Sequence, residues 1–205
     1  MTKSSRKWVK EHEDDLYVRK ARKQGWRSRA VFKLDELQNK DRLIRPGMTI
    51  VDLGASPGGW SQYAAKLMQG KGRVIAVDLL PMDSLAGVDF IQCDFRAEEA
   101  LAAIEASLDG TSADLVLSDM APNVSGMAAV DQPRAMNLAE LALDLATRIL
   151  RPGGSSVIKV FHGEGFDDFV RAARKSFESV LARKPKASRP RSREVYLVAR
   201  NYRMV

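Results

Sequence analysis

Hydrophobic and polar residues follow two patterns along the chain: short apolar runs of strand type, and longer stretches with apolar residues at helical spacing. The expected strands cover residues 48–53, 72–77, 88–92, 114–118, 155–161, 178–182 and 194–199. The expected helices cover residues 28–40, 60–69, 96–108, 132–150 and 166–177. Short strands that alternate with helices of roughly a dozen residues are typical of an α/β protein with a parallel sheet. The last two strands lack a helix between them, so we expect an antiparallel hairpin joined by residues 183–193.

Polar residues recur where the expected strands end. Asp52, Asp78, Asp94, Asp119 and Lys159 all occupy such positions. In parallel α/β sheets ligands bind beyond the carboxyl ends of the strands. The pattern therefore predicts a ligand site at this edge of the sheet.

The glycine-rich segment DLGASPGGW, residues 52–60, follows the first expected strand. Glycines let a backbone approach a nucleotide closely, but the spacing departs from the G-x-G-x-x-G of dinucleotide sites. Asp78 can accept hydrogen bonds from both hydroxyls of a ribose, and Asp94 can accept a hydrogen bond from the exocyclic amine of adenine. Adenosine without a pyrophosphate indicates S-adenosylmethionine rather than NAD. The alternative is that each aspartate caps a helix.

The same segment also matches G-x-S-x-G, the nucleophile elbow of hydrolases. The order Ser56, Asp119, His162 would fit a hydrolase triad. In that fold the residue after the nucleophile donates its backbone N–H to the oxyanion, and here that residue is Pro57, which has no N–H. We therefore interpret Ser56 as a turn residue and His162 as a residue at the edge of the site.

Charge is distributed unevenly. The net charge is +7, with +6 in residues 1–30, −6 in residues 31–182, +6 in residues 183–193 and +1 in residues 194–205. Concentrated positive charge interleaved with Trp8, Tyr17 and Trp26 favours a nucleic-acid partner over solvated tails. We expect residues 1–27 to form a basic extension that binds nucleic acid, RNA if the resemblance described below holds, and residues 28–205 to form the domain that carries the site.

Lys159 lies within an apparently buried strand, SSVIKVF. A buried ammonium needs a carboxylate partner or must lose its proton, unless the side chain extends from a strand end to solvent. Asp119 is the natural partner. Lys33 and Glu194 are expected near the same surface, which would make one coupled cluster.

A single cysteine, Cys93, excludes an internal disulfide, and the chain has no apolar stretch of the roughly 18 residues that a membrane helix needs. Without an apolar signal core at the N-terminus, we expect a cytoplasmic protein that acts outside any membrane. No Cys/His cluster is present, so we expect no metal.

From about Trp26 to Ala199 the chain resembles the FtsJ/RrmJ-type RNA 2′-O-methyltransferases. The segments that carry the resemblance are SRAVFKLDEL, VDLGASPGGWSQ, DLLPMD, SDMAPNVSG, KVFHGEGF and RPRSREVYLV. The resemblance implies a Rossmann-like class I fold with a mostly parallel seven-stranded sheet, a reversed last strand and helices on both faces. It also implies S-adenosylmethionine-dependent methylation of a uridine ribose in large-subunit (23S) ribosomal RNA, within the assembled 50S subunit, by a monomer without a stable protein partner.

The resemblance also assigns site residues. It places a catalytic tetrad on Lys33, Asp119, Lys159 and Glu194. It places cofactor contacts on Gly58, Trp60, Asp78, Asp94 and Asp119. Ser56 and His162 stand where Ala and Gln are expected, and neither belongs to the tetrad.

In the expected mechanism, Lys159 is the general base that takes the ribose 2′ proton. Burial and the Lys33 cation favour the neutral amine that this role needs, whereas Asp119 opposes it and would serve for orientation. Lys33 and Glu194 would position the ribose. A methyltransferase for transfer RNA and a non-catalytic ribosome-assembly factor remain as alternatives.

Overall fold

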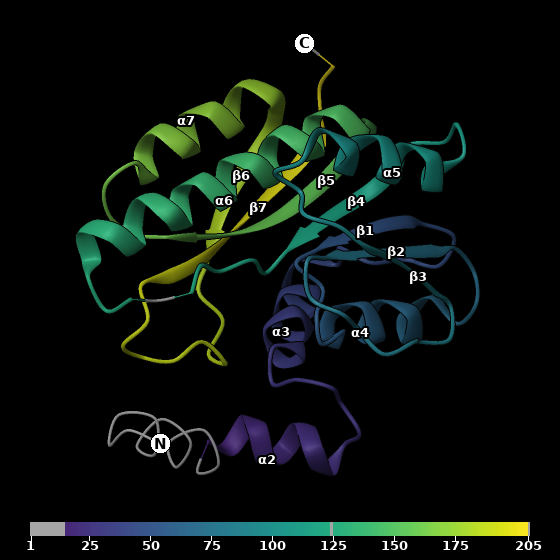
Figure 1. The fold of residues 1–205 in the computed structure, drawn as a ribbon, viewed down its shortest axis with the longest axis horizontal. Coiled ribbons are helices and arrows are strands. Elements are labelled where there is room, and N and C mark those ends of the chain that lie inside the picture. The colour runs from purple at the N-terminus through teal and green to yellow at the C-terminus, as the bar shows by residue number, and fades with distance from the viewer. Residues whose placement is uncertain (1–14, 124, 205) are drawn as a thin grey trace.

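The computed structural model describes residues 15–123 and 125–204, so Trp8 and most of the basic extension lie outside the described residues. One seven-stranded sheet forms the centre of the molecule (Figure 1). Its strands are β1 (Thr49–Leu53), β2 (Arg73–Asp78), β3 (Val88–Gln92), β4 (Ala113–Ser118), β5 (Leu150–Phe161), β6 (Phe177–Arg183) and β7 (Glu194–Tyr202). They lie in the order β3-β2-β1-β4-β5-β7-β6.

The direction of the strands matches the sequence prediction. All pairs from β3 across to β5 are parallel, whereas β7 runs antiparallel to both β5 and β6. The expected hairpin of the last two strands is therefore confirmed, and β7 inserts between β5 and β6. This reversal brings the start of β7 to the edge where the parallel strands end.

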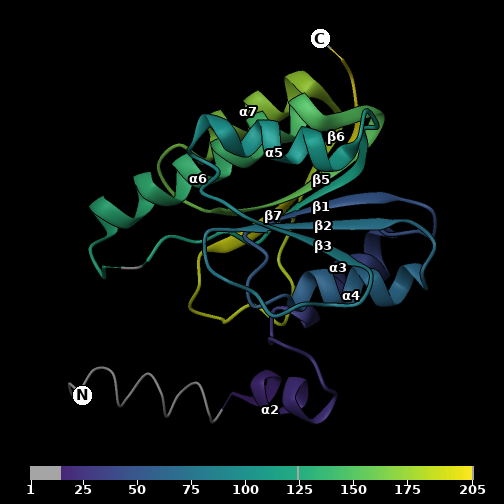
Figure 2. The ribbon, with the colours of Figure 1, turned by 45° about the vertical axis from the view of Figure 1, so that its right-hand side comes forward.

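Helices cover both faces of the sheet. They are α2 (Leu16–Lys23), α3 (Val31–Asp41), α4 (Gly59–Met68), α5 (Glu98–Leu108), α6 (Ala128–Ile149) and α7 (Phe166–Ser176). Helices α5, α6 and α7 lie on one face and α3 and α4 on the other, with α2 beyond α3 (Figures 1 and 2). No helix in residues 15–123 or 125–204 has the length and apolar character that crossing a membrane requires.

Side chains alternate between the two faces of the sheet along each strand, so one strand contributes to two apolar cores. In β1, Val51 and Leu53 belong to the apolar cluster under α5, α6 and α7, while Ile50 belongs to the cluster under α3 and α4. Successive side chains of a strand point to opposite faces, so a strand covered on both sides must be apolar throughout. This explains why the central strands appear in the sequence as continuous apolar runs.

One helix and two element boundaries differ from the sequence prediction. Helix α2 was not predicted, because only Val18 and Ala21 of its residues are buried and its other positions, many of them basic, leave a weak helical pattern of apolar residues. Helix α6 begins at Ala128 rather than at residue 132, since Pro133 in its second turn removes only one backbone hydrogen bond. Strand β5 begins at Leu150 and takes in the expected Pro-Gly-Gly break as a register shift against β4.

Helix α2 is tied to the basic loop 184–193, which joins β6 to β7. Asp15, the N-cap of α2, pairs with Arg29 at 2.9 Å and lies 3.8 Å from Arg189 of this loop. Arg29 also donates a hydrogen bond to the backbone carbonyl of Ala187. Two basic segments far apart in the sequence are therefore held together on one side of the molecule.

A buried ion pair joins α3 to β6. The Asp41 carboxylate accepts two hydrogen bonds from Arg183, from Nε at 2.9 Å and from an Nη at 2.8 Å. These hydrogen bonds outweigh the burial of Asp41, so its pKa lies below the ordinary 3.8. The pair should therefore stabilise the fold above about pH 4, and its contribution should be lost as pH falls through the lower folded-state pKa.

We expect Asp41→Asn to lower the free energy of unfolding by about 2–3 kcal/mol at pH 7. This is below the ~3–5 kcal/mol of a fully buried pair, because one fifth of the Arg183 side chain is exposed. Urea unfolding at pH 7 and pH 3 measures it, and the difference from wild type should shrink at pH 3. Asp144→Asn, which breaks the exposed pair with Arg148, is the control and should cost less than about 0.5 kcal/mol.

Candidate active site

Four charged side chains meet where β4, β5 and β7 bring their ends together beside α3. Lys159 Nζ lies 2.9 Å from Asp119 Oδ1 and 4.0 Å from Glu194 Oε2. Glu194 Oε1 in turn lies 2.8 Å from Lys33 Nζ. The structure thus brings the four expected tetrad residues into one alternating chain of acids and bases.

The register of β5 against β7 sets this arrangement. Lys159 is paired with Tyr196, and Phe161 is paired with Glu194. Residues two apart in a strand share a face, and paired residues in an antiparallel ladder lie opposite each other. The side chains of these two pairs, Lys159 with Tyr196 and Phe161 with Glu194, therefore all face the same side of the sheet.

The site is shielded from water. The side chains of Lys33, Lys159 and Glu194 are each about 10 % exposed or less, and that of Asp119 is 17 % exposed. Burial by itself would raise the pKa of Asp119 and of Glu194, but the two ammonium groups outweigh it, and both pKa values lie below their ordinary range. Both carboxylates are thus ionised, and the two cations balance the two anions.

Tyr196 is a site residue that the sequence reasoning missed. Its hydroxyl donates a 2.6 Å hydrogen bond to Asp119 Oδ1, and its ring packs against Trp60 with centroids 5.6 Å apart. Burial and the nearby Asp119 and Glu194 carboxylates raise the pKa of Tyr196, which keeps it a donor. The signal was available, because Tyr196 lies two residues after Glu194 and so shares its face.

The glycine turn after β1 encloses a cavity of about 170 Å³ together with Ser28, Arg29 and Asp119. Gly54 and Gly58 have φ of +75° and +103°, a region that favours glycine. A Cβ on Gly54 would come within 2.5 Å of the Met120 side chain. Only glycine lets this backbone approach its neighbours so closely.

Two of the five expected cofactor residues, Trp60 and Asp119, line this cavity, whereas Gly58, Asp78 and Asp94 are not among its lining residues. The Trp60 indole is buried, and its Nε1 donates a hydrogen bond to the Ala30 carbonyl.

A Cβ on Gly58 would come within about 3 Å of the Met82 and Arg27 side chains. The Arg27 guanidinium donates hydrogen bonds to the backbone carbonyls of Pro57, Asp83 and Ser84.

The two remaining carboxylates already have partners. The oxygens of Asp78 accept the backbone N–H groups of Ser56 and Leu80, each at 2.8 Å. Asp94 lies outside the cavity lining and forms hydrogen bonds with Arg96, which lower its pKa to about 2. Asp78 keeps free lone pairs for a ligand, whereas a ligand at Asp94 would have to share it with Arg96.

The structure gives no support to the hydrolase alternative. Ser56 Oγ donates to the Pro81 carbonyl at 3.2 Å. The His162 ring packs on Phe166, with centroids 4.3 Å apart.

Within the described ranges, no three Asp, Glu, His or Cys side chains form a group that could hold a metal ion.

A mostly parallel seven-stranded sheet with a reversed β7, together with a glycine turn and carboxylates at the strand ends, defines the class I methyltransferase fold. The sequence profile of the FtsJ-like methyltransferases matches residues 26–202. The chain belongs to this family.

Similar proteins agree with this assignment. The chain is 56 % identical over 203 residues to the "Ribosomal RNA large subunit methyltransferase E" of Legionella pneumophila strain Lens, covering 99 % of this chain and 98 % of that protein. The protein of the same name from strain Corby has the same identity and coverage.

Solved structures show the same fold. A Plasmodium falciparum protein described as a ribosomal RNA methyltransferase superposes with a TM-score of 0.78 at 28 % identity, covering 86 % of this chain and 98 % of that one. Human methyltransferase-like protein 13, solved in complex with SAH, superposes with a TM-score of 0.58 at 15 % identity, covering 84 % of this chain and 80 % of that one. At that identity the second likeness concerns the fold alone.

Asp52, at the end of β1, is a buried acid that the expected chemistry leaves unused. Burial raises its pKa to about 7, although Ser61 Oγ donates a 2.6 Å hydrogen bond to it, and the charges of Asp119 and Asp78 raise the pKa further. The folded state therefore holds a proton that the unfolded state releases near pH 4. Asp52 should make stability fall as pH rises from about 4 to 7.

We expect Asp52→Asn to flatten this decline, by up to about 1.4 kcal/mol per pH unit. Urea unfolding of both proteins at pH 5 and pH 7.5 measures the difference. Ser61→Ala should act in the opposite way and extend the decline to higher pH, since the Ser61 hydrogen bond holds the pKa of Asp52 down. Equal slopes in wild type and Asp52→Asn would contradict the assignment.

Proposed function

We propose that this protein methylates a ribose 2′-hydroxyl of large-subunit ribosomal RNA, at a uridine of the assembled subunit, with S-adenosylmethionine as the donor. The observation that carries the proposal is the chain of Lys33, Glu194, Lys159 and Asp119 beside the glycine-turn cavity. Membership of the FtsJ-like methyltransferases and the names of the relatives support the substrate class.

The residues around the glycine turn suit this cofactor. The backbone turns at Gly54 and Gly58 with positive φ, Asp78 has lone pairs for ribose hydroxyls, and Asp119 borders the cavity. We assign Gly58, Trp60, Asp78 and Asp119 to the cofactor, with Asp94 as an adenine contact that must be shared with Arg96. When bound, S-adenosylmethionine supplies a methyl group that is already activated by a positive sulfonium.

Lys159 is the residue that meets the chemical need of a hydroxyl nucleophile. Its Nζ is within 3.2 Å of both a carboxylate oxygen and the backbone carbonyl of Asp119, so the amine is held in one place. As the general base, Lys159 would first lose its own ammonium proton to solvent. The neutral amine would then take the 2′ proton while the 2′ oxygen bonds to the donated methyl group, a role that supplies roughly 10²–10⁴-fold in rate.

The other tetrad residues hold the base and the ribose in position. Asp119 orients Lys159, and the Tyr196 hydroxyl fixes the carboxylate of Asp119 in turn. Glu194 joins the ammonium of Lys33 to the site and can accept a hydrogen bond from the ribose. Because all four are shielded from water, their positions are set before the RNA arrives.

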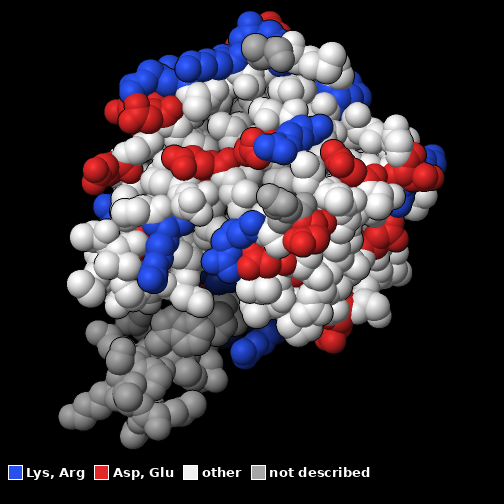
Figure 3. Space-filling view, turned by 45° about the horizontal axis from the view of Figure 1, so that its top comes forward, with Lys and Arg blue, Asp and Glu red and all other residues white. Residues whose placement is uncertain are grey.

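The RNA would contact the basic side of the molecule, formed by α2 and the loop 184–193. Arg29, Asp15 and Arg189 hold these two segments together beside the tetrad. On the side that carries α5, α6 and α7, by contrast, acidic and basic side chains are interspersed (Figure 3). Lysine and arginine contacts to phosphate position RNA without reading its sequence. A ribosomal substrate supports a cytoplasmic location, which we propose for this protein.

Transfer of labelled methyl to large ribosomal subunits from cells that lack this protein tests the function, followed by mapping of the 2′-O-methyl group. We expect one labelled uridine with the wild type, and a rate at least about 10²-fold lower with Lys159→Met. Cofactor affinity, measured by calorimetry, should stay within a few-fold. Lys71→Met, an exposed lysine before β2 at the opposite end of the strands, is the control.

Label on transfer RNA instead would keep the mechanism and change the substrate. Tight cofactor binding without label on any RNA would support the assembly-factor alternative. Full activity of Lys159→Met would remove Lys159 from the chemistry.

A change in the basic loop should act on RNA affinity alone. We expect Lys186→Gln, whose side chain is exposed, to weaken binding to the subunit and to reduce the slope of log K against log salt by about 0.7–0.9. Binding titrations at several salt concentrations measure the slope, with Lys71→Gln as the matched control. An unchanged slope would show that Lys186 makes no phosphate contact.

A further inference from the structure

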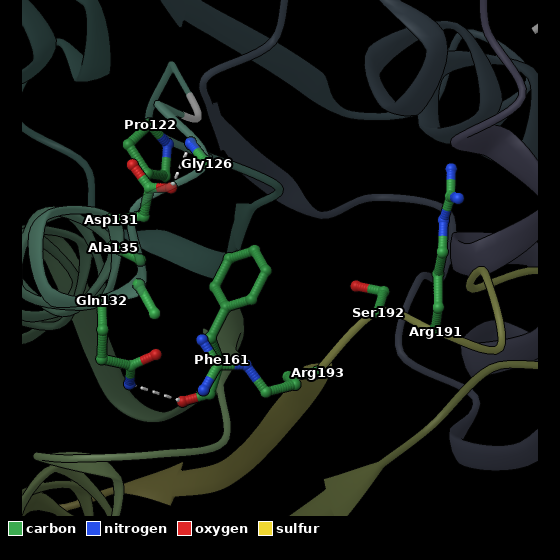
Figure 4. Close-up of a pocket in the computed structure, with 10 residues that line it drawn as sticks. Pro122, Gly126, Asp131, Gln132, Ala135, Phe161, Arg191, Ser192 and Arg193 are labelled. Atoms are coloured by element: carbon green, nitrogen blue, oxygen red, sulfur yellow. Dashed lines mark hydrogen bonds between the residues drawn. The ribbon is translucent and has the colours of Figure 1, made fainter. Parts of the chain in front are cut away.

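Two cavities flank the tetrad. One, of about 280 Å³, lies between α6, the end of β5 and the basic loop, where Arg193 extends toward Phe161 (Figure 4). Because the centroid of the Phe161 ring lies 6.0 Å from Lys159 Nζ, this pocket belongs to the RNA side of the proposed site. The other is the glycine-turn cavity, on the cofactor side. The shape of the cofactor side depends on a residue that the sequence places in the RNA-binding extension, Arg27.

Arg27 is the last residue of that basic extension, but its guanidinium has partners within the protein. Its Nη1 donates hydrogen bonds to the backbone carbonyls of Pro57 at 3.2 Å and Asp83 at 2.6 Å. Its Nη2 donates to the carbonyl of Ser84 at 2.7 Å. One side chain therefore joins the glycine turn to the loop that follows β2, residues 79–87, which we call the β2 loop. An RNA phosphate would have to compete with these three carbonyls.

The β2 loop contains no helix or strand, so side-chain contacts have to hold it in place. Two neutral side chains hold its first residues: Gln92 Nε2 donates to the Leu79 carbonyl at 3.1 Å, and Ser56 Oγ donates to the Pro81 carbonyl at 3.2 Å. The two hydrogen bonds from Arg27 are shorter and charge-assisted, which makes such bonds roughly twice as strong. Arg27 is therefore the strongest of these contacts to the loop.

The spacing between the glycine turn and the β2 loop matters because Asp78 lies between them. One oxygen of Asp78 accepts the N–H of Ser56, in the turn, and the other accepts the N–H of Leu80, in the loop, each at 2.8 Å. A shift of either segment would rotate this carboxylate. The lone pairs that remain on it are the ones that the proposed function gives to the ribose hydroxyls of the cofactor.

The packing around Gly58 shows how closely the two segments approach. A Cβ on Gly58 would come within 2.9 Å of Met82 Sδ and 3.0 Å of Leu85 Cδ1, both in the β2 loop. It would also come within 3.0 Å of Arg27 Nη1. The loop thus lies directly against the turn, with the guanidinium beside their contact.

Arg27 is itself held in place by α4. Its backbone N–H donates to Gln62 Oε1 at 3.0 Å, and Gln62 Nε2 donates to the Gly25 carbonyl at 2.9 Å. Gln62 belongs to α4, whose N-cap is Gly58 of the glycine turn. Because the guanidinium is anchored to the element that it serves, the two segments are ordered before the cofactor arrives. Such preorganisation lowers the entropy that binding costs.

We propose that Arg27 is a positioning residue for the cofactor, whose guanidinium fixes the glycine turn and the β2 loop at the spacing that aims Asp78 at S-adenosylmethionine. The proposal rests on the proposed function for the identity of the cofactor, and it adds a residue that does not line the cavity. It also removes Arg27 from the expected RNA contacts. The planar fork of an arginine reaches carbonyls of two segments at once, which the point charge of a lysine does not.

Calorimetric titration of the full chain with S-adenosylmethionine, without RNA, tests this role. We expect Arg27→Met to weaken cofactor binding roughly 10- to 100-fold, because charge-assisted hydrogen bonds are lost. Arg27→Lys keeps the charge without the fork and should weaken binding about 3- to 10-fold. Arg73→Met is the matched control, since it removes an arginine from the exposed pair with Asp89 at the opposite end of β2, and it should stay within about twofold.

Two further measurements separate positioning from a general effect on the fold. In methyl transfer to large subunits, KM for the cofactor should rise in Arg27→Met while kcat at saturating cofactor stays within a few-fold, since binding and not chemistry is affected. In the cofactor-free protein, the amides of Ser56 and Leu80, which Asp78 protects, should exchange hydrogen faster in Arg27→Met. The amides of β5 and β7 should exchange as in wild type.

The outcomes separate this proposal from the proposed function. Wild-type cofactor affinity in Arg27→Met would overturn the positioning role alone, and weaker binding of that variant to the subunit with a smaller salt slope would return Arg27 to the RNA contacts. Faster exchange throughout Arg27→Met would show that Arg27 stabilises the whole fold, which also overturns the positioning role. Failure of the wild-type protein to bind S-adenosylmethionine would instead overturn the proposed function, and this role with it.

Discussion

The pairing of Lys159 with Asp119, in a place almost closed to water, is the interaction on which the rest of the site depends. A buried ammonium requires an anion, and two carboxylates close together require further cations. Lys33 and Glu194 complete that balance from elements distant in the sequence, and the Tyr196 hydroxyl satisfies Asp119. The site is therefore a closed electrostatic unit, in which the loss of any one charge leaves another unpaired.

The reversed β7 makes this unit possible. A parallel strand at that place would begin at the far edge of the sheet, and neither Glu194 nor Tyr196 would reach Lys159. The antiparallel register instead places Tyr196 opposite Lys159 and Glu194 opposite Phe161. One ladder thus supplies the charged cluster, the donor to Asp119 and the aromatic ring of the neighbouring pocket. The basic loop before β7 then lies beside the site.

Much of the fold could be predicted from the sequence, because strands buried on both faces leave continuous apolar runs and helices leave a 3.6-residue period. The predicted boundaries of helices and strands were wrong where tertiary contacts outweighed the local preference of the sequence. Helix α2 has two buried residues and gains its place from the Asp15–Arg29 pair, and β5 continues through a Pro-Gly-Gly segment that resembles a break. Asp94, one of the expected cofactor residues, accepts a hydrogen bond from Arg96, two residues further along the chain. Any ligand would have to compete with this partner, and the role of Asp94 in cofactor binding stays a prediction.

The sequence by itself determined the sheet, the placement of polar residues at strand ends, the glycine turn and the two basic segments, because each depends on local periodicity or composition. The resemblance to a family supplied the tetrad as a set of residues. Only the tertiary structure decided that Tyr196 binds Asp119, that Asp52 is buried beside two other acids, and that Arg27 joins the glycine turn to the loop after β2. Those facts depend on which residues distant in the sequence meet in the folded chain, and no local pattern records that.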